Sequence, residues 1–426
     1  MAGSIRPVRG MNDVLPEARS AWAAVDVAAE EIFEAYGYRR IRIPVMERTE
    51  LFSRSIGETT DIVQKEMYTF EDRNGSMVTL RPEATAGIVR AGLSHGLFHN
   101  QQQKLWCSGP MFRHEKPQKA RYRQFHQLDV EAIGYAGPEV DAELIVMSAR
   151  LWERLGLESP MLELNSLGTP QARAGYREAL QAYFSQGRDK LDAEGLQRLE
   201  RNPLRILDSK NPDLEALIAE APELTDYLDD DSKAHFERLQ QLLDDVNVGY
   251  ELNTRLVRGL DYYSRTVFEW VTDRLGAQSA ICSGGRYDGL VAQLGGRDTP
   301  AIGWALGIER VVELIEAEGL QIVELLPHAY LTMAGERAQR RGFAIAEELR
   351  KRVPGVRLSM DCLGGSLKSQ LRRADRSGAR MALILGDEEL DVGQISVKAL
   401  REETPQVILT VDATVSALLR VREESP

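Results

Sequence analysis

FRHEKPQKARYRQFHQLDVE, residues 112–131, is the stretch that decides the fold. It links two runs, 104–112 and 124–134, across a basic, loop-like segment at 116–122. The two runs predict antiparallel strands, on which alternate side chains share a face. One face would then carry a guanidinium, carboxylates, an amide and an aromatic ring, from Arg113, Glu115, Phe125, Gln127, Asp129 and Glu131.

The chemistry of that face suits a phosphorylated nucleoside. A guanidinium matches phosphate through its planar fork of donors, and an aromatic ring can stack on a base. Carboxylates can accept hydrogen bonds from an ammonium group or an imidazole N–H. The alternative is a solvated sheet face with cross-strand ion pairs, and the spacing alone leaves both interpretations open.

Upstream of this stretch, helices and short strands are expected. Apolar residues at helical spacing predict a helix over 21–36 that ends at Gly37. Ile41, Ile43 and Val45 alternate like a short strand, in which Pro44 indicates an edge or an interface. The runs 67–70 and 77–80 flank a turn-rich DRNG, which predicts a hairpin, and 83–95 is typical of a helix.

Downstream, the segment from 169 to about 246 predicts a helical insertion. Its leucines and charges recur at helical spacing, and Asn-Pro pairs at 202–203 and 211–212 mark helix boundaries. Strands are expected over 250–256 and 266–271. We predict turns over 282–289 and a helix over 301–317.

The last part of the chain is expected to form a domain of its own. Residues 320–327 are typical of a linker. Beyond them, strands over 329–333, 356–360 and 381–385 alternate with helices over 337–352 and 366–377, which predicts an α/β domain with a partly parallel sheet. The predicted domains are therefore 1–326 and 327–426.

Composition excludes several classes of protein. The sequence has 426 residues, 43% of them hydrophobic, and contains no apolar run long enough for a membrane span or a secretory signal. Its three cysteines form no CxxC pair, so we expect neither a disulfide framework nor a zinc cluster, and a reducing cytoplasm is favoured. The net charge of −12 argues against non-specific coating of nucleic acid. P-loop and Rossmann glycine motifs are also missing from the sequence.

Several strings resemble the signature motifs of class II aminoacyl-tRNA synthetases. Residues 112–125 resemble motif 2, 38–44 resemble motif 1, whose proline lies at the dimer interface, and GWALGIER at 303–310 resembles motif 3. LVRGLDYY at 256–263 and GGRYDGL at 284–290 are similar to strings specific to the histidyl-tRNA synthetase family, and RGMND at 9–13 and LRPEAT at 80–85 also match. The resemblance covers essentially the whole chain. It departs at Ala84, where many members have glycine, and the extra methyl group could shift the loop that holds Glu83.

This resemblance implies a fold and an activity. The fold would be α+β, with a class II synthetase-like antiparallel sheet flanked by helices, a helical insertion and a C-terminal α/β anticodon-binding domain. The activity would be that of a histidine–tRNA ligase, which forms histidyl-adenylate from L-histidine and ATP with Mg²⁺ and transfers histidine to the 3′ end of its tRNA. The implied partners are L-histidine, the acceptor end and anticodon of histidine tRNA, and a second copy of the chain in a cytoplasmic homodimer.

The resemblance also implies a histidine site. A site that hydrogen-bonds the imidazole rejects analogues that lack its polar groups. By matching positions, the site comprises Glu83 and Thr85 at the α-amino group, Gln127 near the carboxylate, Glu131 and Tyr263 at the imidazole, and Tyr262 and Tyr287 along the pocket wall.

The ATP site is implied in the same way. Arg113 and Arg258 would stand on either side of the α-phosphate as the catalytic pair, and the motifs assign no metal ligand. The other implied contacts are Glu115 at the base edge, Phe125 stacked on adenine, Arg310 at the γ-phosphate, and Arg121 at the phosphates or the tRNA acceptor end.

Two alternatives share the catalytic fold. One is the synthetase-like regulatory subunit of ATP phosphoribosyltransferase in histidine biosynthesis, which typically lacks the anticodon domain and has eroded ATP and histidine motifs. Arg113, Arg258, Arg310 and the tail are all present here. The other is a threonyl or prolyl synthetase, which the 256–263 string and the lack of an editing-like insertion oppose.

Overall fold

The chain forms two compact units, Met1–Leu320 and Gln321–Pro426. The computed structural model describes residues 5–58, 60–207, 209, 211–257, 260, 262–276, 280–322 and 324–424. Each unit has a hydrophobic core of its own. The boundary expected at residue 326 falls between helix α10 (Ile308–Ala317) and strand β12 (Ala329–Met333), and its position within that segment stays a prediction.

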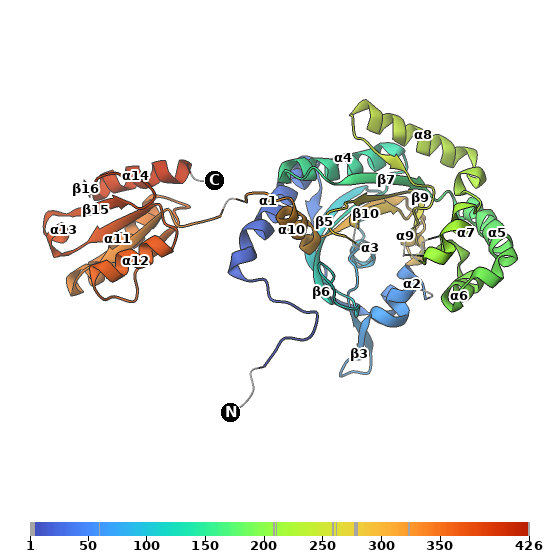
Figure 1. Ribbon diagram of the computed structural model, residues 1–426, viewed down its shortest axis with the longest axis horizontal. Coiled ribbons are helices and arrows are strands. Elements are labelled where there is room, and N and C mark those ends of the chain that lie inside the picture. Colours follow the sequence, from blue (N-terminus) through green and yellow to red (C-terminus); the bar gives the residue numbers. More distant parts are fainter. Residues whose placement is uncertain are drawn as a thin grey trace. The chain divides into compact units, whose positions relative to one another are not determined.

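An eight-stranded sheet is the centre of the first unit (Figure 1). Its order is β1-β5-β6-β11-β10-β9-β7-β8, and the strands from β5 to β7 pair antiparallel, with parallel pairs only at the two edges. The predicted antiparallel pair, β5 with β6, is confirmed. The strands are β1 (Arg39–Arg40), β5 (Gln103–Phe112), β6 (Gln124–Ile133), β7 (Met161–Ser166), β8 (Glu251–Leu252), β9 (Ser264–Val271), β10 (Ala280–Arg286) and β11 (Ala301–Gly307).

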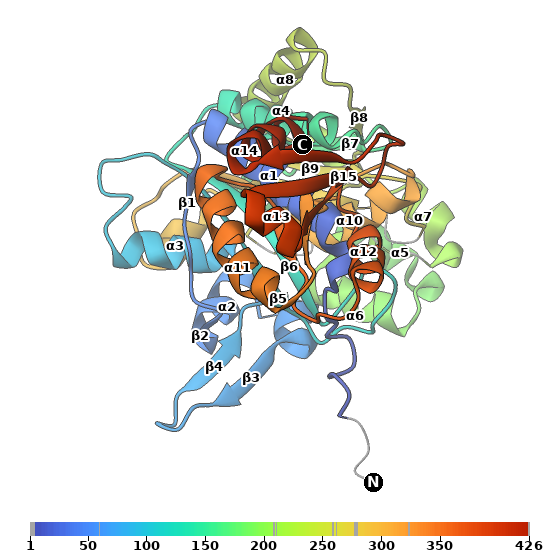
Figure 2. The same cartoon turned by 90° about the vertical axis from the view of Figure 1, so that its left-hand side faces the viewer.

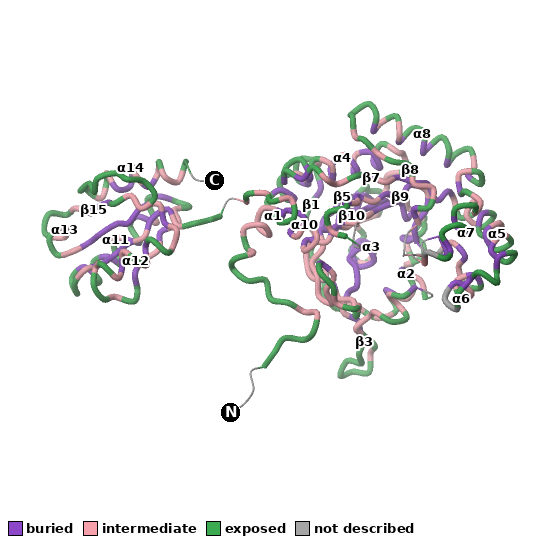
Figure 3. Tube along the Cα trace, in the orientation of Figure 1, coloured by how far each residue is buried: buried purple, intermediate pink, exposed green. Residues whose placement is uncertain are grey.

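Helices α1 (Arg19–Ala35), α4 (Pro138–Leu155) and α10 pack together over this sheet. The apolar stripe of α1 places Phe33 edge-on against Trp106 of β5 and Trp304 of β11, at centroid distances of 5.4 and 5.5 Å. Trp304 also donates to the carbonyl of Leu144 in α4. Burial is concentrated along these strands and helix faces (Figure 3).

A small sheet, β2-β4-β3, projects from the first unit (Figure 2). It contains the predicted hairpin, β3 (Tyr68–Glu71) and β4 (Met77–Leu80), paired with β2 (Met46–Arg48). The strand expected over Ile41, Ile43 and Val45 is wrong. Arg81 explains the difference, because its guanidinium donates to the carbonyls of Ile43 and Pro44 in place of a neighbouring strand. Short helices α2 (Thr49–Ile56), α3 (Thr85–Ser94) and α9 (Leu290–Gln293) complete this region.

The segment 169–246 is helical in its described residues, as predicted. Thr169, Asp192 and Asp229 each accept a backbone N–H with the side chain and so begin a helix. Helix α8 packs against α4, whereas α5, α6 and α7 gather at one end of the unit (Figure 1). No helix in the described part of the chain is long and apolar enough to cross a membrane. The insertion helices are α5 (Pro170–Gln186), α6 (Ala193–Arg201), α7 (Glu215–Ala219) and α8 (Asp230–Asp245).

Three expectations near the end of the first unit are corrected. Of the strand predicted over 250–256, only β8 forms. The turns predicted over 282–289 are strand β10 as far as Arg286, and the first half of the helix predicted over 301–317 is strand β11. Glycines are used here for close packing of strands: a Cβ at Gly284 would come within 2.5 Å of the Gly303 carbonyl. A strand buried on both faces also lacks the alternation that distinguishes it from a buried helix.

The second unit is the predicted α/β domain. Its sheet order is β13-β12-β14-β15-β16, parallel among the first three strands and antiparallel beyond them. The two helices and two strands after residue 385 were not predicted. The elements are β12, α11 (Glu336–Arg352), β13 (Leu358–Met360), α12 (Leu367–Arg376), β14 (Met381–Leu385), α13 (Asp387–Val392), β15 (Gln394–Ala399), β16 (Val407–Thr410) and α14 (Val411–Glu423).

Candidate active site

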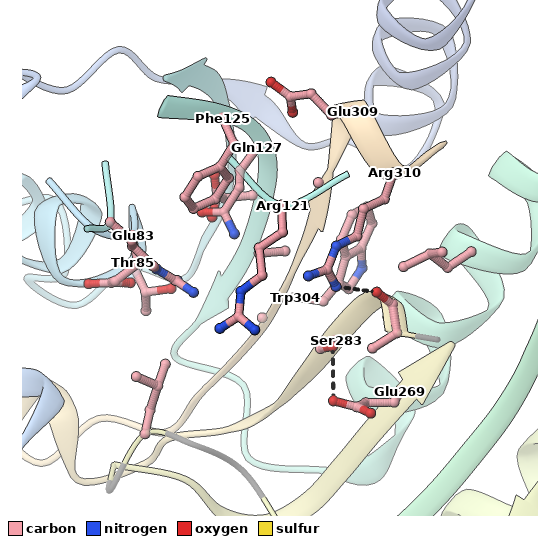
Figure 4. Close-up of a pocket in the computed structure, with 18 of the residues that line it drawn as sticks. Glu83, Thr85, Arg121, Phe125, Gln127, Glu269, Ser283, Trp304, Glu309 and Arg310 are labelled. Atoms are coloured by element: carbon pink, nitrogen blue, oxygen red, sulfur yellow. Dashed lines mark hydrogen bonds between the residues drawn. The ribbon is translucent and has the colours of Figure 1, made fainter. Parts of the chain in front are cut away.

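A pocket of about 280 Å³ opens on the sheet of the first unit, on strands β6, β9, β10 and β11 (Figure 4). Glu83 and Thr85 line one side of it, Arg310 and Trp304 line another, and Arg121 reaches in between. The structure thus brings together eleven of the residues expected at the two ligand sites: Glu83, Thr85, Arg113, Glu115, Arg121, Phe125, Gln127, Tyr262, Tyr263, Tyr287 and Arg310.

Glu131 lies directly behind the pocket wall, where two wall residues hold its carboxylate. Thr85 donates to Oε1 at 2.6 Å and Tyr287 donates to Oε2. Gly303 pairs with Glu131 across the sheet, and a Cβ at Gly303 would overlap the carboxylate. Only glycine at position 303 therefore leaves room for this side chain.

Two buried acceptors at the Glu83 side of the pocket have no protein partner. Glu83 is 4% exposed, and its Oε1 accepts the backbone N–H of Ala86 in α3. Its second oxygen, Oε2, and Oε1 of Gln127 are buried without a hydrogen-bond partner among the described residues. Because leaving a buried acceptor unpaired costs about 1–3 kcal/mol, the pair indicates a ligand that donates hydrogen bonds here.

Three carboxyl groups share this end of the pocket and repel one another. Burial, the largest cause, raises the pKa of Glu83 and of Glu131, and the charge of Asp129 adds to the effect on Glu131. Burial and then the charge of Glu83 raise the pKa of Asp129 to about 8, although Arg81 and Arg113 oppose the shift. A cationic ligand would relieve this repulsion.

Asp129 gives the folding free energy a pH dependence of known sign. Its pKa of about 8 in the folded chain exceeds that of an unfolded aspartate, so the stability it contributes is complete below pH 4 and is lost as pH rises to 8. The free energy of unfolding of Asp129→Asn, relative to that of the parent, should rise by at least about 2 kcal/mol from pH 5 to pH 8, since one pKa unit corresponds to about 1.4 kcal/mol. Urea denaturation at the two pH values measures it.

The control for this prediction is Asp298→Asn, because Asp298 is exposed. This variant should follow the parent at both pH values. A constant difference between Asp129→Asn and the parent would mean that Asp129 is ionised throughout.

Three tyrosines close the same end of the pocket. Tyr262 packs on Tyr263 with ring centroids 4.8 Å apart and edge-on against Tyr287 at 5.7 Å. All three are buried. Burial, before any charge, raises the pKa of Tyr262 and of Tyr287 well above the ordinary value, so both hydroxyls remain hydrogen-bond donors at neutral pH.

Arginines dominate the other end. Arg113 donates from Nε to the Pro82 carbonyl at 2.9 Å and lies over the Phe125 ring at 5.3 Å. Arg310 donates to the carbonyls of Ala120 and Ala280. Burial and then the charges of Arg113 and Arg121 lower the pKa of Arg310, so these guanidinium groups lie near one another. Such a cluster favours a polyanion such as a triphosphate.

Glu115 and Arg121 are joined in the loop between β5 and β6. Their side chains form a salt bridge, with 8% and 38% of the side chain exposed respectively. Arg121 is thus the more exposed partner of this salt bridge. Arg258 lies outside the described residues, so its predicted place beside Arg113 stays a prediction.

Three polar residues that line the pocket, Glu269, Ser283 and Glu309, were not predicted from the sequence. Glu269 of β9 accepts from Ser283 of β10 at 3.2 Å (Figure 4). Glu309, at the start of α10, accepts from the backbone N–H of His126 and contacts its ring. The signal for Glu269 was that it is the one charged residue of the strand 266–271, whereas Glu309 stood unassigned within the motif 3 string.

Comparisons with known proteins agree over the whole chain. A family model described as Histidyl-tRNA synthetase matches residues 10–311, and one described as Anticodon binding domain matches 329–420. The histidine–tRNA ligase of Alkalilimnicola ehrlichii is 56% identical over 420 residues, which cover 99% of this chain and 97% of the relative. That of Halorhodospira halophila is 56% identical over 414 residues, covering 97% of each.

A solved structure supports the same grouping. The apo crystal structure of S. aureus histidyl-tRNA synthetase is 35% identical, covers 98% of this chain and 100% of its own, and superposes with a TM-score of 0.82. Family model, full-length identity and fold coincide, and the chain belongs to the histidyl-tRNA synthetase family.

Proposed function

We propose that the pocket of the first unit joins histidine to ATP as histidyl-adenylate and that the chain then transfers histidine to its tRNA. The observation that carries this proposal is the division of one pocket into a carboxyl-rich end, with two unpartnered buried acceptors, and an arginine-rich end. An amino acid with an ammonium and an imidazole suits the first end, and a triphosphate suits the second.

At the carboxyl-rich end, each histidine group has a matching residue. The ammonium would donate to Glu83 Oε2, which is buried without a partner, and to Thr85, while the amide NH₂ of Gln127 would donate to the carboxylate. Glu131, already oriented by Thr85 and Tyr287, would accept the imidazole N–H together with Tyr263, and Tyr262 and Tyr287 would close the wall.

At the arginine-rich end, the chemistry is attack of the histidine carboxylate on the α-phosphorus of ATP. One carboxylate oxygen forms the new P–O bond while the bond to pyrophosphate breaks, and negative charge grows on the phosphate oxygens. Arg113 would bind the α-phosphate, and by resemblance Arg258 would face it from the other side. Cations already in place stabilise the developing charge without reorganisation.

The remaining ATP contacts follow from the same placement. Phe125, beneath the Arg113 guanidinium, offers its ring to adenine. Glu115 would accept from the base edge, Arg310 would meet the γ-phosphate, and Arg121 would contact the phosphates or, turned outward, the acceptor end of the tRNA.

Mg²⁺ would enter with the phosphates of ATP. Mg²⁺ in such sites is held by one or two carboxylates plus substrate oxygens, and the described residues contain no cluster of three His, Cys, Asp or Glu that could form a protein cage. Glu269 fits this donor set, because it lies in the pocket near Arg310. Bound Mg²⁺ would neutralise part of the phosphate charge.

Two further properties belong to the proposal. We propose a homodimer formed through the small sheet, because Val45, Met46, Phe70 and Met77 are 38–50% exposed there and the resemblance places Pro44 at an interface. Sedimentation of the parent chain as a monomer at micromolar concentration would contradict it.

A cytoplasmic location is supported by the free cysteines, Cys107, Cys282 and Cys362.

The experiment that decides the function is histidine-dependent exchange of pyrophosphate into ATP, repeated with the other amino acids. We expect exchange with histidine alone. Absence of that exchange would end the proposal. The regulatory-subunit alternative predicts no charging of tRNA and is opposed by the anticodon-binding domain over 329–420.

Removal of residues 327–426 should separate the two half-reactions. We expect pyrophosphate exchange within a fewfold of the parent, because the first unit has its own core. Charging of tRNA should fall by about 10²-fold or more, since each specific base contact is worth about 1–3 kcal/mol. Exchange and charging assays on the same preparation measure both, and equal losses would mean that the second unit is chiefly structural.

A further inference from the structure

A buried ion pair lies behind the histidine end of the pocket and joins helix α4 to the end of β10. Asp141 of α4 and Arg286 of β10 are both 0% exposed. Arg286 Nη2 lies 2.7 Å from Asp141 Oδ1, and Arg286 Nε donates to Oδ2 at 3.0 Å. His235 and Thr266 contact the same Oδ2 at 2.8 and 2.6 Å. Oδ2 of Asp141 thus has three hydrogen-bond partners, whereas Oδ1 is stabilised by the charge of Arg286 alone.

Arg286 uses the rest of its guanidinium to hold the backbone around it. Its Nη1 donates to the Tyr135 carbonyl and to Asp288, both at 3.1 Å, and its Nη2 donates to the Gly137 carbonyl at 2.7 Å. Asp288 in turn accepts the backbone N–H of Ala301 at the start of β11. Only a planar fork with donors on three nitrogens spans these positions, so lysine cannot replace it.

The residue after this anchor is Tyr287, which faces the pocket. The pairing of β9 with β10 shifts register between Gly285 and Arg286, and such an irregularity re-aims the side chains beside it. Neighbouring residues then point opposite ways: Arg286 to Asp141 behind the sheet, and Tyr287 to Glu131 in front. The orientation of the Glu131 carboxylate therefore depends on the Arg286–Asp141 ion pair, here called the clamp, which does not line the pocket.

His235, on α8, ties the helical insertion to this clamp. Arg265 Nη1 lies 3.5 Å from His235 Nδ1. Because a guanidinium can only donate, Nδ1 accepts and Nε2–H donates to Asp141. Arg265 has φ +46°, a left-handed conformation that is unfavourable for a residue with a Cβ. Such a conformation persists only where the surrounding contacts maintain it, and it is common near functional sites.

We propose that Arg286 is a positioning residue for histidine selection, anchored by Asp141 and His235, which sets the Tyr287 hydroxyl against Glu131. The inference rests on the proposed function, because it takes Glu131 as the group that accepts the imidazole. It adds a connection between the helical insertion and the amino-acid site that runs through buried contacts alone.

Arg286→Lys tests the proposal in pyrophosphate exchange. The substitution keeps the charge opposite Asp141 but removes the fork. We expect KM for histidine to rise at least about tenfold, a change worth about 1.4 kcal/mol, while KM for ATP stays within about twofold. Arg373→Lys is the matched control, because Arg373 makes a comparable two-point ion pair with Asp361 in the second unit, at 2.6 and 2.9 Å. It should leave both KM values unchanged.

A double-mutant cycle with Tyr287→Phe separates positioning from general loosening. If Arg286 acts through the Tyr287 hydroxyl, Arg286→Lys should raise KM for histidine far less in the Tyr287→Phe background than in the parent. Additive effects, or equal increases in KM for histidine and ATP, would overturn the proposal.

Thr266→Val provides a second test if Arg286→Lys does not fold. It removes one donor to Asp141 and keeps the side-chain shape, so the same selective rise in KM for histidine is expected at smaller size. A normal KM in that variant would overturn the inference. Failure of the proposed function is distinguishable, because the parent chain itself would then show no exchange with histidine.

Discussion

Arg113→Gln is expected to lower the rate of histidine-dependent pyrophosphate exchange by about 10³-fold, near the upper end of losses on removing one donor to transition-state charge. Arg113 is well placed for that role. Its guanidinium is held by the Pro82 carbonyl through Nε and by the face of Phe125, which directs the terminal nitrogens to the pocket. Burial lowers the pKa of Arg113 below its ordinary range, and nearby carboxylates oppose the change.

The defect of Arg113→Gln should lie in the chemical step and leave histidine binding intact. Calorimetric titration with histidine alone should give a Kd within about threefold of the parent, because no histidine contact is assigned to Arg113. Arg113→Lys should recover part of the rate, since it restores charge without the fork. Arg340→Gln, at an exposed arginine of α11, is the control and should exchange normally. Exchange by Arg113→Gln within tenfold of the parent would remove Arg113 from the catalytic step.

The strands that carry the site could be predicted because their polar residues alternate. Phe125, Gln127, Asp129 and Glu131 fall on one face of β6, and the structure brings their side of the sheet to one pocket. Period-two alternation survives in the sequence whatever the surrounding fold. The same reasoning found the hairpin of β3 and β4, where the turn residues determine the connection.

The strands on the far side of the pocket could not be predicted by pattern. β10 and β11 are buried on both faces. They contain glycines that leave room for a neighbouring strand, as Gly303 does for the Glu131 side chain of β6. A glycine needed for close approach resembles a glycine needed for a turn until the neighbouring strand is known. In the second sheet, the strands were predicted only as far as strands and helices alternate along the sequence. Strands β15 and β16, which extend this sheet in the antiparallel direction, were therefore not predicted.

Contacts between distant segments account for the rest of the site. Asp141, Thr266 and Arg286 are far apart in sequence, and no local spacing connects them. The family strings identified Tyr287 as a pocket residue but said nothing of the clamp behind it. Such networks become visible only when the elements that carry them, α4, β9 and β10, are packed together.

Glu131→Gln is expected to have the largest effect on the choice of amino acid. The carboxylate of Glu131 is 1% exposed and receives hydrogen bonds from Thr85 and Tyr287, so it has one fixed orientation. An amide keeps one acceptor oxygen and presents an NH₂ in place of the other, so at least one of the contacts with Thr85, Tyr287 and the imidazole N–H must be reversed or lost. We expect kcat/KM for histidine to fall by about 10³-fold, or about 4 kcal/mol, with KM for ATP nearly unchanged.

Selectivity is the sharper measurement for this residue. Parent enzyme and variant should be compared in pyrophosphate exchange with histidine and with histidine methylated on a ring nitrogen. The parent should prefer histidine by at least about 10²-fold, because a buried acceptor left unpaired is costly, and Glu131→Gln should lose most of that preference. Tyr287→Phe, which keeps the carboxylate, should fall between them. Burial of the carboxylate raises the pKa of Glu131 because it disfavours the charged form, so an uncharged amide removes that cost and the Tm of Glu131→Gln should not fall. A variant that keeps the parent's preference for unmethylated histidine would show that the imidazole is read elsewhere.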